Sequence, residues 1–408
     1  PTATLDLLTD LVDHSLLTRT SDPDRTPRFG MFEVIQEFAQ ERLTAAGEAD
    51  AARSRHAQHF LRFARELRPV ASLHACFAPL AQLAAEQANL RAALDWLATH
   101  GPVADFGALA AALGLAWYAY GAYQEGQTWL DRALAVRDQL PAAEQVRLLV
   151  GAAGIAFAQG DLEQTNRLLD QGRALLSDAA DPLDRALLLM LQGAVHNDEG
   201  EPAAAEACLG QALAVAGQID DDLLATGIAS RALLNLSVSA HRRHDWGRAA
   251  TFVEAALARD RSGRLDLTQA NALLARGDVA SEAGDWELAA RSWSQGLARL
   301  GERGDPRMMA DALSGLARIA ADAGRHDDAA LLFGAADAAR ERTGAATLWP
   351  PAREAADRSW AVVQTALGEA TAARLWTEGR RRPWLEIIAV AATVGESLAT
   401  PENNPPHR

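Results

Sequence analysis

The chain is 408 residues long, 49% hydrophobic and 23% charged, with a formal net charge of −15. No apolar run is long enough to span a membrane, and no basic region followed by an apolar stretch marks a secretory signal. The acidic balance argues against binding a nucleic-acid backbone by general electrostatics. Because the sequence contains no lysine, it also lacks a Walker-A phosphate lysine and lysine Schiff-base chemistry.

Two cysteines, Cys76 and Cys208, lie far apart within or beside helical patterns. Such a pair is expected to be two reduced thiols in a cytoplasmic protein. The chain has no initiator methionine and opens almost directly into a helical pattern. We therefore expect it to be a piece of a longer protein.

Residues 1–47 combine helical and extended patterns. Apolar residues at helical spacing predict a first helix from Thr4 to Asp13. A strand, a polar hairpin, a second strand and an amphipathic helix are predicted next, over residues 15–19, 21–27, 28–31 and 32–43. Helix, hairpin and helix in this order form the back half of a winged helix, so we expect a partial winged helix here.

Residues 48–102 carry two more helical patterns and are expected to form a linking helical cap. The first pattern runs from Ala51 to Leu67, and Arg68-Pro69 is expected to end it because proline disfavours a continuing helix. The second pattern runs from Phe77 to Leu97.

A period of about 40 residues organises residues 103–342. Short turn signals recur 39 to 44 residues apart, with the turn residues at Gly121, Gly160, Gly200, His244, Gly284 and Gly324. In every unit small side chains stand seven residues before the turn residue and twelve after it, and five after it the residue is Gly, Ala or Thr. Small residues at the crossing points let two antiparallel helices approach closely. The pattern predicts an all-α, right-handed α-solenoid of six helix-pair repeats.

After Gly344 the repeat stops, and Trp349-Pro350-Pro351 interrupts the pattern. Three helices are predicted next, over residues 352–367, 371–379 and 383–394. A solenoid needs its last apolar face covered, so residues 343–397 are expected to form a helical C-cap. The tail over 398–408 is too polar and too rich in proline to pack, and we expect it to be disordered.

The pattern of small and large positions around each turn resembles the tetratricopeptide repeat, and the resemblance covers about residues 103–342. The period is longer than is usual for that family, and its closing proline is mostly missing. In its period the chain is more similar to the longer-repeat sensor solenoids of bacterial regulators. The resemblance implies that the first helix of each pair lines a concave inner groove.

The string "LVDHSLL…RFGMFEVIQEFAQERL" is similar to the winged-helix end of the nucleotide-binding module in STAND-class signalling ATPases, which include large LuxR-type transcriptional regulators. The stretch "NLRAALDW" is similar to the one that couples winged helix and solenoid in those regulators. The family's M-H-D motif falls on Met31, Phe32 and Glu33. Phe32 replaces the histidine that senses nucleotide phosphates, which argues against direct nucleotide sensing here. The resemblance implies intramolecular contact with a nucleotide-binding domain of the parent.

Candidate groove residues follow from the tetratricopeptide resemblance, repeat by repeat. They are aromatic toward the N-terminal end and of mixed charge toward the C-terminal end: Tyr118, Phe157, Asn197, Asp198, Arg231, His241, Arg242, Asn271, Asp278, Glu282, Arg318 and Asp322. Polar residues of both signs in one groove suit a peptide, a protein or a polar small-molecule inducer. A long solenoid must also present some solvated polar face, and the sequence leaves both interpretations open.

No catalytic, cofactor or metal pattern is complete. The pairs His56/His59 and His241/His244 have the spacing of two ligands on a helix face, but neither belongs to a fuller ligand set. We therefore interpret them as solvated or packed histidines and expect no metal and no cofactor. Trp293 holds the large apolar position of its repeat and is interpreted as packing between repeats.

These features favour a binding protein rather than an enzyme. We expect the sensor portion of a STAND-type regulator, in which an inducer or protein in the groove controls the ATPase and output domains of the parent. The alternative is a protein–protein interaction scaffold without a small ligand. A hydrolase with a site between the repeats and the cap is a second, weaker alternative.

Overall fold

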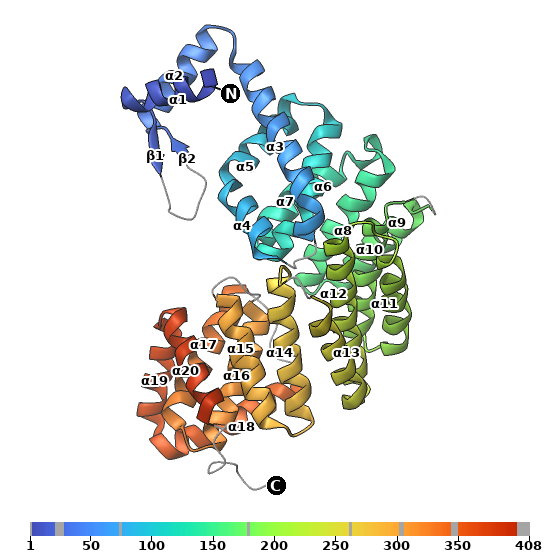
Figure 1. Cartoon of the computed structure of the whole chain (residues 1–408), viewed down its shortest axis with the longest axis vertical. Helices are drawn as coiled ribbons and strands as arrows, with labels where there is room; N and C mark the ends of the chain where they lie inside the picture. Colours follow the sequence, from blue (N-terminus) through green and yellow to red (C-terminus); the bar gives the residue numbers. More distant parts are fainter. Residues whose placement is uncertain are drawn as a thin grey trace.

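The computed structural model describes residues 2–20, 28–72, 76–177, 180–260, 263–301, 306–343 and 350–397. In these ranges the chain is helical except for one two-stranded hairpin. The helices stack along a long axis, and the two ends of the chain lie at opposite ends of the molecule (Figure 1). The predicted hairpin tip and C-terminal tail lie outside the described residues.

The N-terminal segment, residues 2–45, follows the predicted order of helix, hairpin and helix. Its elements are α1 (Thr2–Asp13), β1 (Thr18–Thr20), β2 (Arg28–Gly30) and α2 (Glu33–Ala45). The strands pair antiparallel, with Arg19 opposite Phe29. The segment projects from the rest of the molecule (Figure 1) and meets it through the next helix and through Arg28, which contacts Ala85 and Glu86.

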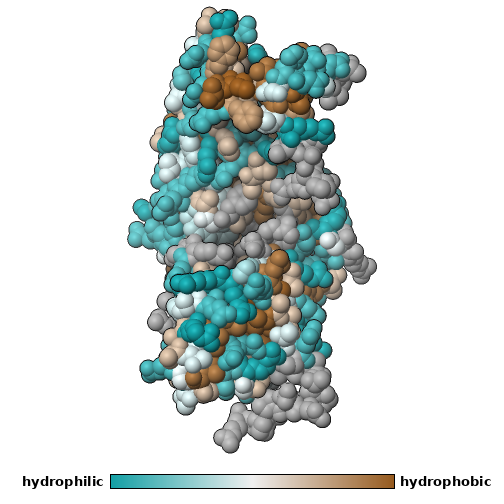
Figure 2. Space-filling model, turned by 90° about the vertical axis from the view of Figure 1, so that its left-hand side faces the viewer, coloured by the Kyte–Doolittle hydropathy of each residue, from teal (hydrophilic) through white to brown (hydrophobic). Residues whose placement is uncertain are grey.

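Large apolar side chains are exposed on this N-terminal segment. Phe32 is 60% exposed, Phe38 62% and Val34 77%. Hydrophobic surface gathers near the top of Figure 2, where this segment lies. Such a patch is typical of a surface that contacts another protein part.

Three helices link this segment to the solenoid: α3 (Ala49–Ser72), α4 (Phe77–Ala85) and α5 (Gln87–His100). The prediction that Arg68-Pro69 ends the first helix is wrong, because α3 continues to Ser72. The prediction of one helix from Phe77 to Leu97 is also wrong. The chain leaves helical geometry at Glu86, with φ −101° and ψ 10°, and this residue separates α4 from α5.

Twelve helices follow in antiparallel pairs over the described part of residues 103–343. The pairs are α6 (Val103–Tyr120) with α7 (Tyr123–Leu134), α8 (Ala142–Ala158) with α9 (Leu162–Leu175), α10 (Pro182–Asp198) with α11 (Pro202–Ala216), α12 (Asp222–Arg242) with α13 (Trp246–Arg259), α14 (Asp266–Glu282) with α15 (Trp286–Leu300), and α16 (Pro306–Asp322) with α17 (His326–Thr343). A short 3₁₀ helix, Arg137–Gln139, follows α7. Each first helix packs on its partner and on the first helix of the neighbouring pair.

The turns within the pairs have one local geometry. The turn glycines adopt left-handed backbone, as at Gly160 with φ 81°, where a side chain would be strained. Asp161, Asp245 and Asp285 then cap the second helices by accepting a hydrogen bond from the backbone N–H three residues later. His244 holds the turn position of the fourth pair with φ 58°, although it is not glycine.

The recurring small residues are buried where the helices cross. Ala205, Ala249 and Ala289, five residues after the turn, have no exposed surface. A Cβ added to Gly277 would lie 2.4 Å from the Trp293 ring, so glycine makes room for the indole. The main apolar core is continuous from α3 to α20.

The chain ends in α18 (Pro350–Leu367), α19 (Glu369–Arg381) and α20 (Trp384–Ser397). Helix α19 packs closely on α17, since a Cβ at Gly379 would lie 2.0 Å from the carbonyl oxygen of Leu331. Helix α20 lies against α15, where Ser294 Oγ donates to the carbonyl of Ala391 at 2.9 Å. These helices cover the end of the last pair.

One described helix, α12, is long and apolar enough to cross a membrane by length and composition alone. It packs against α10, α11, α13 and α14, and 56% of its most apolar stretch is buried in the protein. We therefore describe α12 as a core helix of the solenoid.

Candidate functional site

The twelve predicted groove residues all lie on the first helices of the pairs, from α6 to α16. Four of them, Asp198, Arg242, Glu282 and Asp322, occupy the same place, two residues before the turn residue of their repeat. Because the first helices pack side by side, this register aligns charged side chains from four successive repeats.

These residues form a charged strip, defined as Asp198, His241, Arg242, Glu282, Arg318 and Asp322. Arg242 Nη2 donates to Asp198 Oδ1 at 3.1 Å, and both side chains are partly exposed. Such an exposed pair contributes only ~0–1 kcal/mol to stability. It can therefore open to bind a ligand at little cost.

The histidine and the arginines of the charged strip are partly buried, whereas its three carboxylates are exposed. Burial lowers the pKa of His241, and the nearby carboxylate of Glu282 opposes that shift, so the imidazole is neutral at pH 7. Burial also lowers the pKa of Arg318, opposed by Asp322 and Glu282. The Arg318 guanidinium lies 5.8 Å from the ring centroid of Trp286, within cation–π range.

Asp278 lies on the same helix as Glu282 and has a structural partner. Trp293 Nε1 donates to Asp278 Oδ1 at 2.8 Å. Burial raises the pKa of Asp278 to about 7, the Trp293 hydrogen bond opposes this, and the carboxylates of Asp311 and Glu282 add to it. Asp278 is therefore a carboxyl group that titrates near neutral pH and holds an indole in place.

The aromatic end of the predicted groove is brought close to the fourth repeat. Burial lowers the pKa of Arg231 on α12, and the phenol of Tyr118 on α6 opposes that shift. Side chains of the first and fourth repeats therefore interact electrostatically. Tyr118 and Phe157 are both partly buried against the core.

The two asparagines of the predicted set differ. Asn197 is buried, donates to the carbonyl of Asn235 at 3.0 Å and accepts from Ser239 Oγ at 2.8 Å, so it ties α10 to α12. Asn271 Oδ1 is buried and has no hydrogen-bond partner in the structure. An unpaired buried acceptor is uncommon, and a ligand donor could satisfy it.

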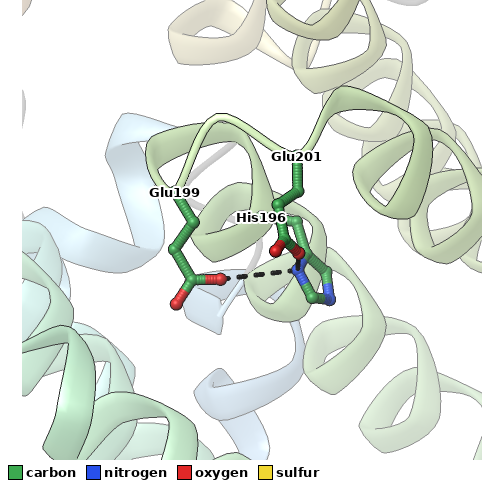
Figure 3. A group of neighbouring side chains, drawn as sticks. All are labelled: His196, Glu199 and Glu201. Carbon is green, nitrogen blue, oxygen red and sulfur yellow. Dashed lines mark hydrogen bonds and ion pairs between the residues drawn. The ribbon is translucent and has the colours of Figure 1, made fainter.

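A group with metal-ligand chemistry lies at the turn between α10 and α11, and sequence reasoning missed it. His196 Nδ1 lies 3.0 Å from a carboxylate oxygen of Glu201 and 3.5 Å from one of Glu199 (Figure 3). The three ligand atoms lie within 4.8 Å of one another. All three side chains are partly exposed, and Glu199 also accepts from Asn166 at 2.7 Å, so polar contacts within the protein account for the arrangement. The H-x-x-E-x-E spacing was the available signal.

The histidine pairs noted in the sequence make aromatic and polar contacts. His56 Nε2 lies 3.4 Å from Asn89 Oδ1, and His59 meets the Phe60 ring edge-on. His241 and His244 both lie edge-on to Trp246, at 4.7 and 5.3 Å between ring centroids.

A second open surface lies on the C-cap. A hollow of about 680 Å³ is lined by one face of α19 and the residues that follow it, including Arg374, Glu378 and Arg382. Both arginines pair with Glu378, Arg382 at 2.5 Å and Arg374 at 3.4 Å. The hollow is open, and its only carboxylate, Glu378, is already paired with Arg374 and Arg382. We therefore rank it below the charged strip as a candidate site.

No family model matches this chain. It is 31% identical over 205 residues to proteins of Mycobacterium bovis and Mycobacterium tuberculosis that are described as HTH-type transcriptional regulators. The matched region covers 50% of this chain and 21% of each relative, so the match spans about a fifth of the relatives' length.

Two solved structures are similar over most of the chain. A Rap protein complexed with competence and sporulation factor has a TM-score of 0.52 at 12% identity, covering 86% of this chain and 97% of that one. The apo form of RapI has a TM-score of 0.48 at 9% identity, covering 86% and 100%. The fold is a tetratricopeptide-like helical solenoid. The predicted all-α solenoid is thus confirmed.

Proposed function

We propose that this chain is the ligand- or partner-sensing part of a STAND-type transcriptional regulator. It binds an inducer or a protein on the inner face of its first helices and thereby controls the ATPase and output domains of the parent. Binding can shift such a switch only through different affinities for its two states. The parent acts in the cytoplasm, and this chain itself performs no catalysis.

The charged strip is the observation that carries the proposal. Successive repeats place opposite charges next to each other, as in the Asp198–Arg242 pair. A peptide or zwitterionic molecule could replace such pairs by its own charges, while Asn271 Oδ1 supplies a buried acceptor. The regulator relatives and the Rap complex with competence and sporulation factor support a regulatory, partner-binding role.

The N-terminal segment supplies the proposed contact with the parent. Its exposed Phe32, Val34 and Phe38 fit an apolar partner surface, which in our proposal belongs to the nucleotide-binding domain. We accordingly divide the chain into a partial winged helix (1–47), a linking helical cap (48–102), six repeats (103–342), a helical C-cap (343–397) and a tail (398–408).

Native mass spectrometry of the whole chain, after incubation in lysate of its own host, tests the proposal. A small added mass that Arg242→Glu abolishes would support a ligand sensor. The matched control is Arg173→Glu, because Arg173 lies on a second helix, is mostly exposed and pairs with its neighbour Asp170.

Two other outcomes carry different meanings. A protein-sized addition lost in Arg242→Glu would favour the scaffold alternative over the inducer. Binding that survives Arg242→Glu together with a charge reversal at Glu282 would contradict the inner face as the binding surface.

A further inference from the structure

Helix α3 makes one polar contact with each of the first three repeats. Its partners form a carboxylate row, defined as Asp105, Glu144 and Asp184, which lie in the first turns of α6, α8 and α10. Gln58 Nε2 donates to Asp105 Oδ2 at 2.6 Å, and Arg65 Nη2 lies 3.4 Å from Glu144 Oε1. Arg68 makes the third contact, to Asp184.

The three carboxylates of the row occupy the same position in their repeats. Each carboxylate stands sixteen residues before the turn residue of its repeat, at Gly121, Gly160 and Gly200. Neighbouring first helices therefore present these groups side by side. On α3 the contacting residues are spaced by seven and three, which places them on one helix face.

Arg68 and Asp184 form the buried centre of this contact. Arg68 is 7% exposed and Asp184 3%. Arg147 on α8 donates to the other Asp184 oxygen at 2.8 Å and also lies 3.3 Å from Glu144. Ala111, Leu115, Val150 and Leu187 surround the ion pair, so the guanidinium lies against the first helices of three repeats.

Helix α3 continues for one turn beyond this ion pair. Pro69 cannot donate a helical hydrogen bond, which weakens the last turn locally, yet the helix continues to Ser72. Beyond the end of α3, buried Cys76 lies 3.0 Å from the carbonyl of Arg264, just before α14. The cap thus bridges the first three repeats and the start of the fifth.

The charges around the carboxylate row indicate which partner could bind there in place of α3. With α3 in place, Arg65, Arg68 and Arg147 face Glu144, Asp184 and Asp181, while Asp105 accepts from Gln58. Without α3, Glu144, Asp181 and Asp184 would share the single guanidinium of Arg147, and Asp105 would lose its donor Gln58. Leaving buried charges unpaired is strongly unfavourable, so α3 leaves only when other cations replace its arginines.

We propose that α3 is an internal ligand of the solenoid, and that an arginine-bearing helix of a protein or peptide partner competes with it for the carboxylate row. Rotation of the displaced α3 then moves the attached N-terminal segment. This deepens the proposed sensing function and rests on it for its regulatory consequence. The partner presents two guanidinium groups three residues apart on one helix face.

A labelled synthetic peptide copying residues 53–72 tests this on the whole chain by fluorescence anisotropy. We expect it to bind a chain carrying Arg65→Gln and Arg68→Gln at least tenfold more tightly than the wild type, because the internal competitor is weakened. Adding Asp184→Asn to that chain should remove the gain. The control peptide carries the same two glutamines but keeps Arg53, Arg55 and Arg62, so it separates this site from general charge attraction.

Equal binding of the two peptides, or equal affinity for wild-type and variant chains, would overturn the proposal. If the variant chain loses its helical circular dichroism, hydrogen exchange on the wild type with saturating peptide decides instead. Amides of residues 61–72 should then exchange at least tenfold faster, and unchanged exchange refutes competition. Since no residue of the charged strip is altered, failure here is distinct from failure of the Arg242→Glu test.

Discussion

Asp278→Asn should make the stability of the protein less dependent on pH. The folded-state pKa of Asp278 is about 7, well above the ordinary value of 3.8, because the carboxyl is buried. Between these values the folded state holds a proton that the unfolded state has lost. The contribution of Asp278 to the free energy of unfolding is therefore fully present below about pH 3.8 and is lost as the pH rises through 7.

The structure sets the size of the effect. A pKa shift from 3.8 to about 7 corresponds to about 4 kcal/mol in the free energy of unfolding. Asp278 is only partly buried by surface area, so solvent screening should reduce this to about 1–2 kcal/mol. Asparagine keeps an oxygen to accept from Trp293 Nε1 but carries no charge. The variant should thus unfold about 1–2 kcal/mol less readily than wild type at pH 8, and equally at pH 4.

Urea denaturation followed by far-UV circular dichroism at pH 4 to 8 measures this difference. Asp138→Asn is the control, since the Asp138 side chain is 92% exposed. A solenoid need not unfold in one step, so midpoints are compared only where slopes agree. If Asp278→Asn differs from wild type by the same amount at every pH, the buried, protonated carboxyl is the wrong description.

Three substitutions test the packing by thermal unfolding. Gly379→Ala should cost about 2–3 kcal/mol, because the new Cβ meets the Leu331 backbone, whereas the control Gly210→Ala has open space and should gain up to about 1 kcal/mol. A neutral Gly379→Ala would rule out the close α17–α19 crossing. His244→Gly should stabilise by up to about 1 kcal/mol by relieving left-handed strain, and a loss would mean that the Trp246 contact outweighs it. Ala289→Leu should lower the free energy of unfolding by about 1–3 kcal/mol, and an unchanged melting temperature would contradict a close helix crossing at Ala289.

The groove residues show where sequence reasoning reached its limit. All twelve lie on the first helices of the pairs, because the repeat period fixes which residues belong to each helix. The repeat period could not distinguish Asn197 from Asn271. The side chain of Asn197 is hydrogen-bonded to Asn235 and Ser239, whereas the Asn271 Oδ1 acceptor has no hydrogen-bond partner. Hydrogen-bond partners on another helix are not encoded in the spacing of one helix.

The sequence by itself determined the solenoid, because small residues, left-handed turn glycines and capping aspartates act locally and recur with one period. Only the tertiary structure decided the course of α3. Local propensity ends that helix at Pro69, but α3 continues to Ser72, and Arg68 pairs with Asp184, 116 residues away. An ion pair between distant residues has no periodic signature, so it appears only once the repeats have stacked and brought their first turns together.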